Sequence, residues 1–439
     1  MQWKNDTYTG WGRALSAHGE LARPERISAL HELIGEGAAP AIGARRSYGD
    51  AALNSGGRAL DMTRLDRLIG FDPDTGIVEV EAGVTMADLV RVFAPKGWMP
   101  AAVPGTGAVT VGGAIAFDVH GKNHGTAGSF GQYVESLHLI GPEKSRVISP
   151  KREAKLFAAT MGGMGQTGVI ESAKLRLVPC PSTGIELVET RVSGLAEMMR
   201  RIEDSSAPFT VAWIDATARG DDLGRGILEE ARFPEPAQDA VKGGRALAVP
   251  FEMPGFLLSR AFVRAFNALY FRRVSEAGRI RIVGLSQFLF PLDRIASWNR
   301  LYGRRGMHQF QAVLPEAEIG GIEAMLREIA RGSVAAPLAV LKKTGPGRAG
   351  PMSFPMEGYS LAVDFPNNTK ARGLIGRLCA MTAQAGGRIY LAKDTVALPA
   401  QVEAMYPDIG AWRETVNAAD PEGFYETDLV RRLNLRGRR

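Results

Sequence analysis

Cysteine is scarce in this chain, and long apolar runs are absent. The 439 residues include only two cysteines, Cys180 and Cys379, which are too few and too far apart for a disulfide framework or a zinc site. We expect two free thiols and no metal. No apolar run approaches the roughly 18 residues of a membrane-spanning helix, and the N-terminus lacks the apolar stretch of a secretory signal. These absences predict a cytoplasmic or peripheral membrane protein.

Concentrated positive charge is missing as well. The formal net charge is +6, but lysine and arginine are scattered, apart from a run within 431–439. The interleaved aromatic residues of a nucleic-acid platform are absent. We therefore predict no nucleic-acid partner, and we expect the charge to serve anionic small ligands or an acidic membrane surface. A chain with 45% hydrophobic and 23% charged residues is typical of globular proteins, and its length suits two domains.

Glycine is abundant, and two stretches contain it at high density. Residues 101–130 read AAVPGTGAVTVGGAIAFDVHGKNHGTAGSF, and residues 40–50 read PAIGARRSYGD. Glycine lets the backbone approach a ligand closely, and the N–H groups of a turn beside arginines form a concave anion site. An ordinary glycine-rich surface loop would explain the first stretch alone. The second, matching stretch favours a ligand-binding role for both.

The order of predicted elements indicates an α+β fold. Short helices and strands alternate irregularly through residue 178, unlike a regular doubly wound sheet, and residues 1–20 are predicted to be irregular. No G-x-G-x-x-G stands between a strand and a helix, which argues against a Rossmann domain. Further strands are predicted over 185–193, 209–217, 287–291, 307–314, 338–343, 359–365 and 388–392. In the strand 307–314, alternation places Gln309 and Gln311 on one face, where a sugar would supply partners for their amides.

Six segments carry a likeness to a known family. They are GARRSYGD (43–50), PGTGAVTVGGAIAFDVHGKNHGTAGSFG (104–131), GGMGQTGVI (162–170), FNALYFRR (266–273), VDFP (363–366) and GGRIYLAKD (386–394). Together they resemble the vanillyl-alcohol-oxidase type of FAD oxidoreductase and, within it, the decaprenylphosphoryl-β-D-ribose 2-oxidase family. The resemblance implies a PCMH-type FAD-binding domain over 1–180, an antiparallel-sheet substrate domain over 181–390, and a segment 391–439 that returns to the first domain.

The resemblance also implies which residues bind the cofactor. Tyr48 stands where many relatives of the wider superfamily carry a histidine bonded covalently to the flavin, so the FAD here is expected to be noncovalent. The implied FAD contacts are Ile42, Gly43, Ala44, Arg45, Arg46, Ser47, Tyr48, Gly49, Gly105, Thr110, Val111, Gly112, Gly113, Phe117, Asp118, Val119, His120, Ile170 and Tyr390.

The catalytic residues implied by the resemblance are Lys393, His120 and Lys122. Lys393 would lie at the polar edge of the flavin and contact substrate. His120 and Lys122 would line the sugar pocket, and His120 is either a proton acceptor or relay, or a structural histidine bonded to flavin or backbone. The substrate contacts are Tyr48, Trp213, Gln309, Gln311, Lys342 and Lys393, with Lys342 placed to meet a phosphate.

These residues imply an oxidase of a secondary sugar hydroxyl, namely C2 of a polyprenylphosphoryl-β-D-ribose. A separate short-chain reductase would complete epimerisation to arabinose. Two departures weaken the match: Ala362 replaces a cysteine of the family, and Phe290 replaces an expected tyrosine. The alternatives are an aldonolactone or alditol oxidase on the same fold, and a flavin-free lipid- or anion-binding protein.

Residues 233–259 are rich in proline and glycine and contain closely spaced apolar side chains. They lead into an amphipathic basic segment, 260–273. One interpretation is a flap that contacts a membrane surface or a lipid tail. The other is an ordinary long loop followed by a core helix. The sequence leaves both open.

Overall fold

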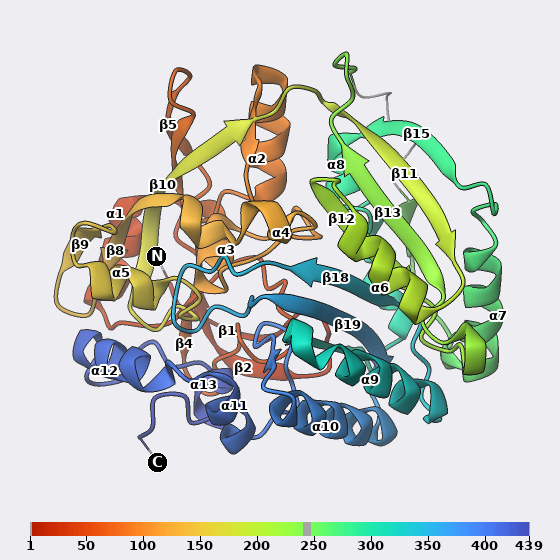
Figure 1. The fold of residues 1–439 in the computed structure, drawn as a ribbon. Coiled ribbons are helices and arrows are strands. Elements are labelled where there is room, and N and C mark those ends of the chain that lie inside the picture. Colours follow the sequence, from red (N-terminus) through yellow and green to blue (C-terminus); the bar gives the residue numbers. More distant parts are fainter. Residues whose placement is uncertain (1, 240–246, 439) are drawn as a thin grey trace.

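The computed structural model describes residues 2–239 and 247–438, which form three layers of sheet with helices packed around them (Figure 1). The first half of the chain holds two sheets. The smaller has the order β1 (Lys4–Thr9), β2 (Ser16–Ala22), β4 (Arg58–Asp61), β3 (Ala41–Ile42). The larger has the order β5 (Leu68–Asp72), β6 (Ile77–Glu81), β10 (Val169–Pro179), β8 (Val134–Ile140), β9 (Ser145–Ile148), and β7 (Trp98–Pro100) also pairs with β10.

An eight-stranded antiparallel sheet forms the second half. Its order is β15 (Arg279–Gly284), β11 (Gly184–Val192), β13 (Gly226–Arg232), β12 (Phe209–Ile214), β18 (Ala339–Thr344), β19 (Gly358–Pro366), β17 (Met307–Leu314), β20 (Arg388–Ile389). A two-stranded parallel ribbon joins β14 (Leu247–Ala248) and β16 (Ile295–Ala296). The change of sheet falls between β10 and β11. The mixed architecture confirms the predicted α+β class.

Helices cover the sheets. In the first half they are α1 (Ile27–Gly35), α2 (Met86–Phe93), α3 (Val111–Ala116), α4 (His124–Ala127) and α5 (Ala154–Thr160). The second half contributes α6 (Leu195–Asp204), α7 (Arg260–Phe271), α8 (Leu285–Leu289), α9 (Ile319–Arg331) and α10 (Thr369–Gln384), followed by α11 (Pro399–Met405), α12 (Ile409–Ala419) and α13 (Asp428–Arg432). Among the described residues, no helix has both the length and the apolar character needed to span a bilayer.

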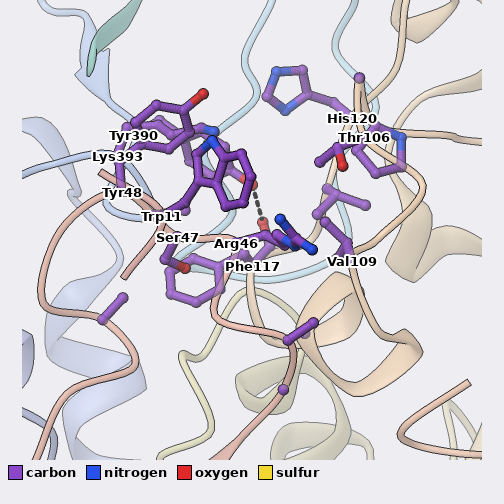
Figure 2. Close-up of a pocket in the computed structure, with 18 of the residues that line it drawn as sticks. Trp11, Arg46, Ser47, Tyr48, Thr106, Val109, Phe117, His120, Tyr390 and Lys393 are labelled. Carbon is purple, nitrogen blue, oxygen red and sulfur yellow. Dashed lines mark hydrogen bonds between the residues drawn. The ribbon is translucent and has the colours of Figure 1, made fainter. Parts of the chain in front are cut away.

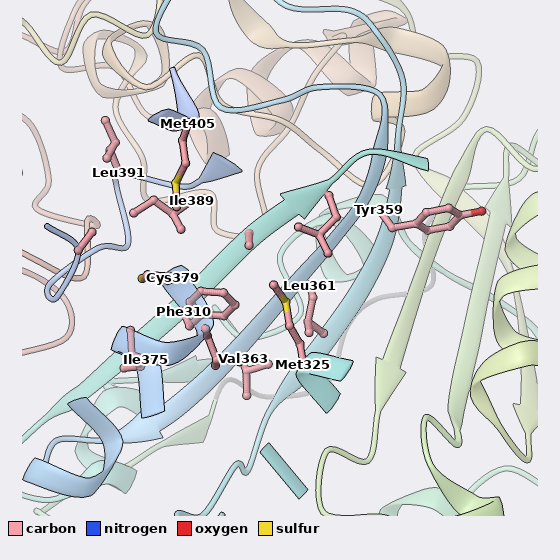
Figure 3. Close-up of a cluster of buried hydrophobic side chains, with 14 of the residues drawn as sticks. Phe310, Met325, Tyr359, Leu361, Val363, Ile375, Cys379, Ile389, Leu391 and Met405 are labelled. Carbon is pink, nitrogen blue, oxygen red and sulfur yellow. The ribbon is translucent and has the colours of Figure 1, made fainter. Parts of the chain in front are cut away.

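Strict alternation along the central strands gives the eight-stranded sheet two different faces. Phe310, Leu341 and Val363 point to one face, where they join a buried apolar cluster with residues of α9 and α10 (Figure 3). Gln311 and Lys342 point to the opposite face, toward a cavity. Because successive side chains of a strand alternate between the two faces of a sheet, one face packs into the apolar core and the other lines the cavity.

The last helices lie against the first half of the chain (Figure 1). Trp412 Nε1 on α12 donates to the carbonyl of Ala159 on α5 at 3.2 Å. The Arg432 guanidinium on α13 bonds the carboxylates of Asp50 and Asp394, at 2.6 and 2.9 Å. The contacts with Ala159 and Asp50 join the C-terminal segment to the first half, whereas the division at 180 and 390 stays a prediction.

Two predicted elements are wrong. Residues 1–20, predicted to be irregular, form most of the β1–β2 hairpin. Its buried face carries small residues such as Ala17 and Gly19, so large apolar residues do not mark the alternation. Residues 287–291, predicted as a strand, belong largely to α8, in which Leu285, Phe288 and Leu289 are buried at helical spacing.

Candidate active site

A cavity of about 420 Å³ lies between the glycine-rich segments and the inner face of the eight-stranded sheet. It brings together most of the predicted site residues. Those lining it are Ile42, Gly43, Ala44, Arg45, Arg46, Ser47, Tyr48, Gly105, Thr110, Gly112, Gly113, Phe117, Val119, His120, Lys122, Ile170, Trp213, Gln309, Gln311, Lys342, Tyr390 and Lys393. Residues more than 300 positions apart in the sequence therefore line the same cavity (Figure 2).

The turn over residues 43–48 has the character of an anion site. In the described chain, the backbone N–H groups of residues 44–47 donate to no other backbone group, although these residues line the cavity. Arg45 adopts a left-handed φ of 52°, and the Arg46 guanidinium stacks over the Trp11 ring at 4.3 Å. Burial lowers the pKa of Arg46, so a bound anion would be favoured beside it. This arrangement fits the diphosphate of an FAD.

Close backbone packing supports the same fit. Thr110 Oγ1 caps α3 by accepting from Gly113 N at 3.2 Å. A Cβ at Gly43 would lie 2.2 Å from that Oγ1, and one at Gly112 would lie 3.1 Å from the Ala82 Cβ. A Cβ at Gly105 would meet nothing within 4 Å, so this backbone is open toward the cavity. The glycines thus bring backbone close to whatever occupies the cavity.

Three predicted cofactor residues do not line the cavity. Gly49 packs against the Asp394 carbonyl, where a Cβ would lie 1.9 Å away. Val111 is fully buried in the apolar core. Asp118 is fully buried, and its carboxylate accepts hydrogen bonds from Ser129, Gly131, Ala349 and Ser353. These positions support the loops structurally, and their assignment as cofactor contacts stays a prediction.

Lys393 lies in a turn, and the predicted strand 388–392 ends at Ile389. Lys393 N donates to the Tyr390 carbonyl at 2.8 Å, and Tyr48 N donates to the Ala392 carbonyl at 3.0 Å. The second bond fastens the turn to the 43–48 segment. Lys393 Nζ consequently lies 3.9 Å from the Tyr48 ring centroid, and Figure 2 shows Tyr48, Tyr390 and Lys393 grouped together.

A buried carboxylate faces this lysine. Asp364 on β19 accepts from Gln309 Nε2 at 2.5 Å and from the Tyr302 hydroxyl at 3.0 Å, and burial raises its pKa to about 6. Burial lowers the pKa of Lys393 to about 7; the Asp364 charge opposes this shift and Lys342 adds to it. An amine with that pKa is present in both protonation states near neutrality, as a proton acceptor requires.

Two further lysines, Lys122 and Lys342, line the cavity. Lys122 Nζ donates to the Phe288 carbonyl at 2.5 Å and lies 3.8 Å from the Phe288 ring centroid. Lys342 projects from β18 on the cavity face. Burial lowers the pKa of each to about 8, and the charge of Lys122 lowers that of Lys342 further. A pair of partly desolvated ammonium groups favours an anionic ligand between them.

His120 is oriented by Gln311. Gln311 Nε2 lies 3.1 Å from His120 Nε2 and 3.2 Å from Ser360 Oγ. An amide nitrogen can only donate, so His120 Nε2 is the acceptor and Nδ1 carries the hydrogen. Burial, followed by the charge of Lys342, lowers the pKa of His120 well below its usual value. His120 is thus a neutral side chain whose buried Nδ1 has no partner among the described residues.

The cavity also contains residues that sequence reasoning missed. Trp11 comes from the segment predicted to be irregular, and Glu229 and Asp293 are acids that no motif marked. Asp293 accepts from Gly107 N at 2.7 Å, which ties the region after α8 to the glycine-rich stretch. Glu229 pairs with Val211 across β12 and β13; strand alternation beside Trp213 is the signal that could have found it.

Ala362 lines the cavity at the position where the family carries a cysteine. The lining residues in the described chain include no cysteine, and both thiols of the protein are buried elsewhere. A thiol-directed inhibitor therefore has no nucleophile to modify in this cavity.

Comparisons with known proteins agree with this geometry. A family model described as an FAD binding domain matches residues 27–148. A decaprenylphosphoryl-beta-D-ribose oxidase of Mycolicibacterium smegmatis is 35% identical over 97% of this chain and 97% of that protein, and an uncharacterized Streptomyces coelicolor protein is 31% identical over 80% of this chain and 100% of its own length. A D-arabinono-1,4-lactone oxidase of Eremothecium gossypii is 30% identical over 27% of this chain and 24% of that protein. The similarity to the ribose oxidase thus extends through the sheet domain, whereas that to the lactone oxidase covers about a quarter of the chain.

Proposed function

The chain belongs to the family of FAD-dependent decaprenylphosphoryl-β-D-ribose oxidases, and from this premise we propose that it oxidises the C2 hydroxyl of a polyprenylphosphoryl-β-D-ribose to the ketone. The observation that carries the proposal is one cavity in which an anion-binding turn faces three half-buried lysines and a polar strand face. A separate short-chain reductase would then reduce the ketone to the arabinose epimer. Tyr48 at the flavin-proximal turn supports a noncovalent cofactor.

The sheet face supplies the groups that would hold the sugar phosphate. Lys122 and Lys342 would bind the phosphate, since both are desolvated cations that line the cavity. The Gln309 and Gln311 amide nitrogens already have protein partners, contrary to the expectation that a sugar would satisfy them. In the described chain the side-chain amide oxygen of Gln311, Oε1, has no such partner, which leaves it to accept a hydrogen bond from a sugar hydroxyl.

Proton transfer is assigned to Lys393 in this proposal. FAD, when bound, accepts the hydride from the carbon that is oxidised. Lys393, with a pKa of about 7, would take the hydroxyl proton at Nζ. His120 is the weaker choice as acceptor, because its Nε2 already receives the Gln311 amide; its Nδ1–H would instead donate a hydrogen bond.

An anaerobic absorbance titration tests the substrate assignment. Purified yellow protein should bleach on addition of a polyprenylphosphoryl ribose, and denaturation should release the flavin into the supernatant. Bleaching only by aldonolactones or alditols would favour the lactone-oxidase alternative. A colourless protein that FAD cannot reconstitute would favour the flavin-free alternative.

The pH dependence of kcat/KM should be bell-shaped. The rate should rise through about pH 7 as Lys393 loses its proton, and it should fall above about pH 8 as Lys122 and Lys342 lose the charges that bind phosphate. A phosphodiester substrate does not titrate in this range, so the enzyme determines both limbs. In Lys342→Arg the falling limb should move to higher pH, because guanidinium stays charged. A profile without a rising limb near pH 7 would contradict the assignment of Lys393.

Replacing Lys342 should weaken substrate binding more than turnover. In Lys342→Met the KM should increase about 10- to 100-fold, as expected for the loss of a charge-assisted hydrogen bond, while kcat changes much less. The matched control is Lys343→Met, because Lys343 points to the other face and pairs with Glu203 at 2.5 Å. Steady-state kinetics on both variants provide the test, and an equal rise in KM for both would argue against a phosphate site at Lys342.

A further inference from the structure

Large apolar side chains are exposed together over residues 247–280. Half of the exposed large apolar side chains of the described chain fall in this interval, including Phe251 and Phe256, which are 63% and 66% exposed. On α7, Phe262, Phe266 and Leu269 are 45%, 49% and 70% exposed. Scattered exposed apolar residues are normal, whereas a contiguous patch marks an interaction surface.

Helix α7 separates this patch from the active-site cavity. Its inner face buries Val263 and Asn267, and Tyr270 on the same side lines the cavity. Aromatic rings connect the two sides of the helix. The ring centroids of Phe266 and Tyr270 are 6.0 Å apart in a stacked arrangement, and those of Tyr270 and Trp213, in the cavity wall, are 4.7 Å apart. An apolar surface therefore continues from the outer face of the helix to the substrate cavity.

Polar anchors hold the helix in this orientation. At its start, the Arg260 guanidinium donates to the carbonyls of Ala330 and Gly332. In its middle, Asn267 Nδ2 donates to the buried Asp215 carboxylate at 3.0 Å. Just beyond its end, Arg273 pairs at 2.7 Å with Glu189, whose side chain is fully buried. The apolar residues of the outer face are therefore displayed by an anchored helix.

Positive charge predominates on this surface. Arg264 and Arg272 are exposed beside the apolar residues, and α7 contains no acidic residue. Within the described residues 247–280, the two acids are Glu252 and Glu276, and each pairs with an arginine: Glu252 with Arg13 at 2.6 Å and Glu276 with Arg191. A helix with aromatic and aliphatic residues flanked by arginines has the character of one that lies in the interface of an anionic bilayer.

We propose that the outer face of α7, formed by Phe262, Arg264, Phe266 and Leu269, docks onto an anionic lipid bilayer together with the flanking residues Phe256 and Arg272. Docking there would place the cavity entrance beside the membrane, with the Phe266–Tyr270–Trp213 rings along the path of a lipid tail. This consequence rests on the proposed lipid-linked substrate, but the bilayer contact itself does not. Of the two interpretations of residues 233–273, the proposal favours membrane contact; residues 240–246 lie outside the described residues.

Vesicle flotation of the full flavin-loaded chain tests the docking. The chain should float with vesicles of phosphatidylcholine mixed with phosphatidylglycerol, and less with pure phosphatidylcholine or at high salt. The variant Phe262→Ser/Phe266→Ser/Leu269→Ser should bind at least about tenfold more weakly, because binding scales with the buried apolar area. The matched control is Leu398→Ser/Phe424→Ser, at residues 60% and 45% exposed outside the patch, which should bind as the unaltered chain does.

Two results would overturn the proposal. One is equal vesicle binding by the triple variant and the unaltered chain. The other is an absence of vesicle binding together with a dimer, seen by sedimentation velocity, that the triple variant dissociates, because a second copy would then cover the face. Turnover separates this proposal from the function: if vesicles bind as expected but no ribose lipid bleaches the protein, the proposed function fails and the docking surface stands.

Discussion

Lys393→Met should lower kcat by about 100- to 10,000-fold, the range expected for loss of a general base. The substitution removes the amine that lies over Tyr48 and faces Asp364 while keeping an unbranched side chain. Flavin content and substrate KM should change little, since the anion-binding turn and Lys342 remain. Single-turnover bleaching by stopped flow measures this effect directly. The variant Lys343→Met, at a partly exposed lysine that pairs with Glu203, should react at the unaltered rate.

Lys393→Arg separates the two roles that a lysine can have here. If the amine acts as a proton acceptor, arginine cannot replace it, because guanidinium is never deprotonated at these pH values. The arginine variant should then be about as slow as the methionine variant. Recovery of the rate in Lys393→Arg, or a loss below tenfold in Lys393→Met, would contradict the assignment and indicate a purely electrostatic role.

Gly49→Ala should separate the two segments that form the active site. A Cβ at this position would lie 1.9 Å from the Asp394 carbonyl oxygen and 3.0 Å from the Thr395 Cγ2. Because the nearest clashing atom belongs to the backbone, the turn carrying Lys393 would have to move away from Tyr48. We expect a loss of about 3 kcal/mol in the free energy of unfolding, a Tm lower by about 3 °C, and weak flavin retention.

The control for this substitution is Gly410→Ala. A Cβ at Gly410, within α12, would meet no atom within 4 Å, so alanine should be neutral or slightly stabilising in a helix. Thermal denaturation monitored by flavin fluorescence compares the two variants. Unaltered Tm and flavin content in Gly49→Ala would show that the contact between residues 49 and 394 does not hold the site together.

Local patterns in the sequence predicted much of the fold. Alternation correctly placed Gln309 and Gln311 on one face of β17, where both line the cavity. The hairpin over 4–22 escaped prediction because its buried residues are small, and α8 because five residues hold only one helical repeat. Such short elements are determined by the surfaces they pack against.

The site was predictable only where a motif marked it. Residues 43–48, Tyr390 and Lys393 belong to recognised motifs, and they line the cavity. Trp11, Glu229 and Asp293 also line it, but no local sequence pattern marks them, because tertiary packing places them there. The roles of Gly49 and Asp118 also depend on partners distant in sequence, Asp394 and Ser353. A motif identifies a segment that matters, but the contacts of each residue decide whether it binds a ligand or supports the loop.

The most direct test of the central claim is anaerobic stopped-flow bleaching with polyprenylphosphoryl ribose carrying deuterium at C2. Hydride removal from C2 predicts severalfold slower bleaching for this substrate than for the unlabelled one, with no slowing when deuterium is at C3 instead. Equal rates for the C2-labelled and unlabelled substrates, or slowing only with the C3 label, would contradict oxidation at C2.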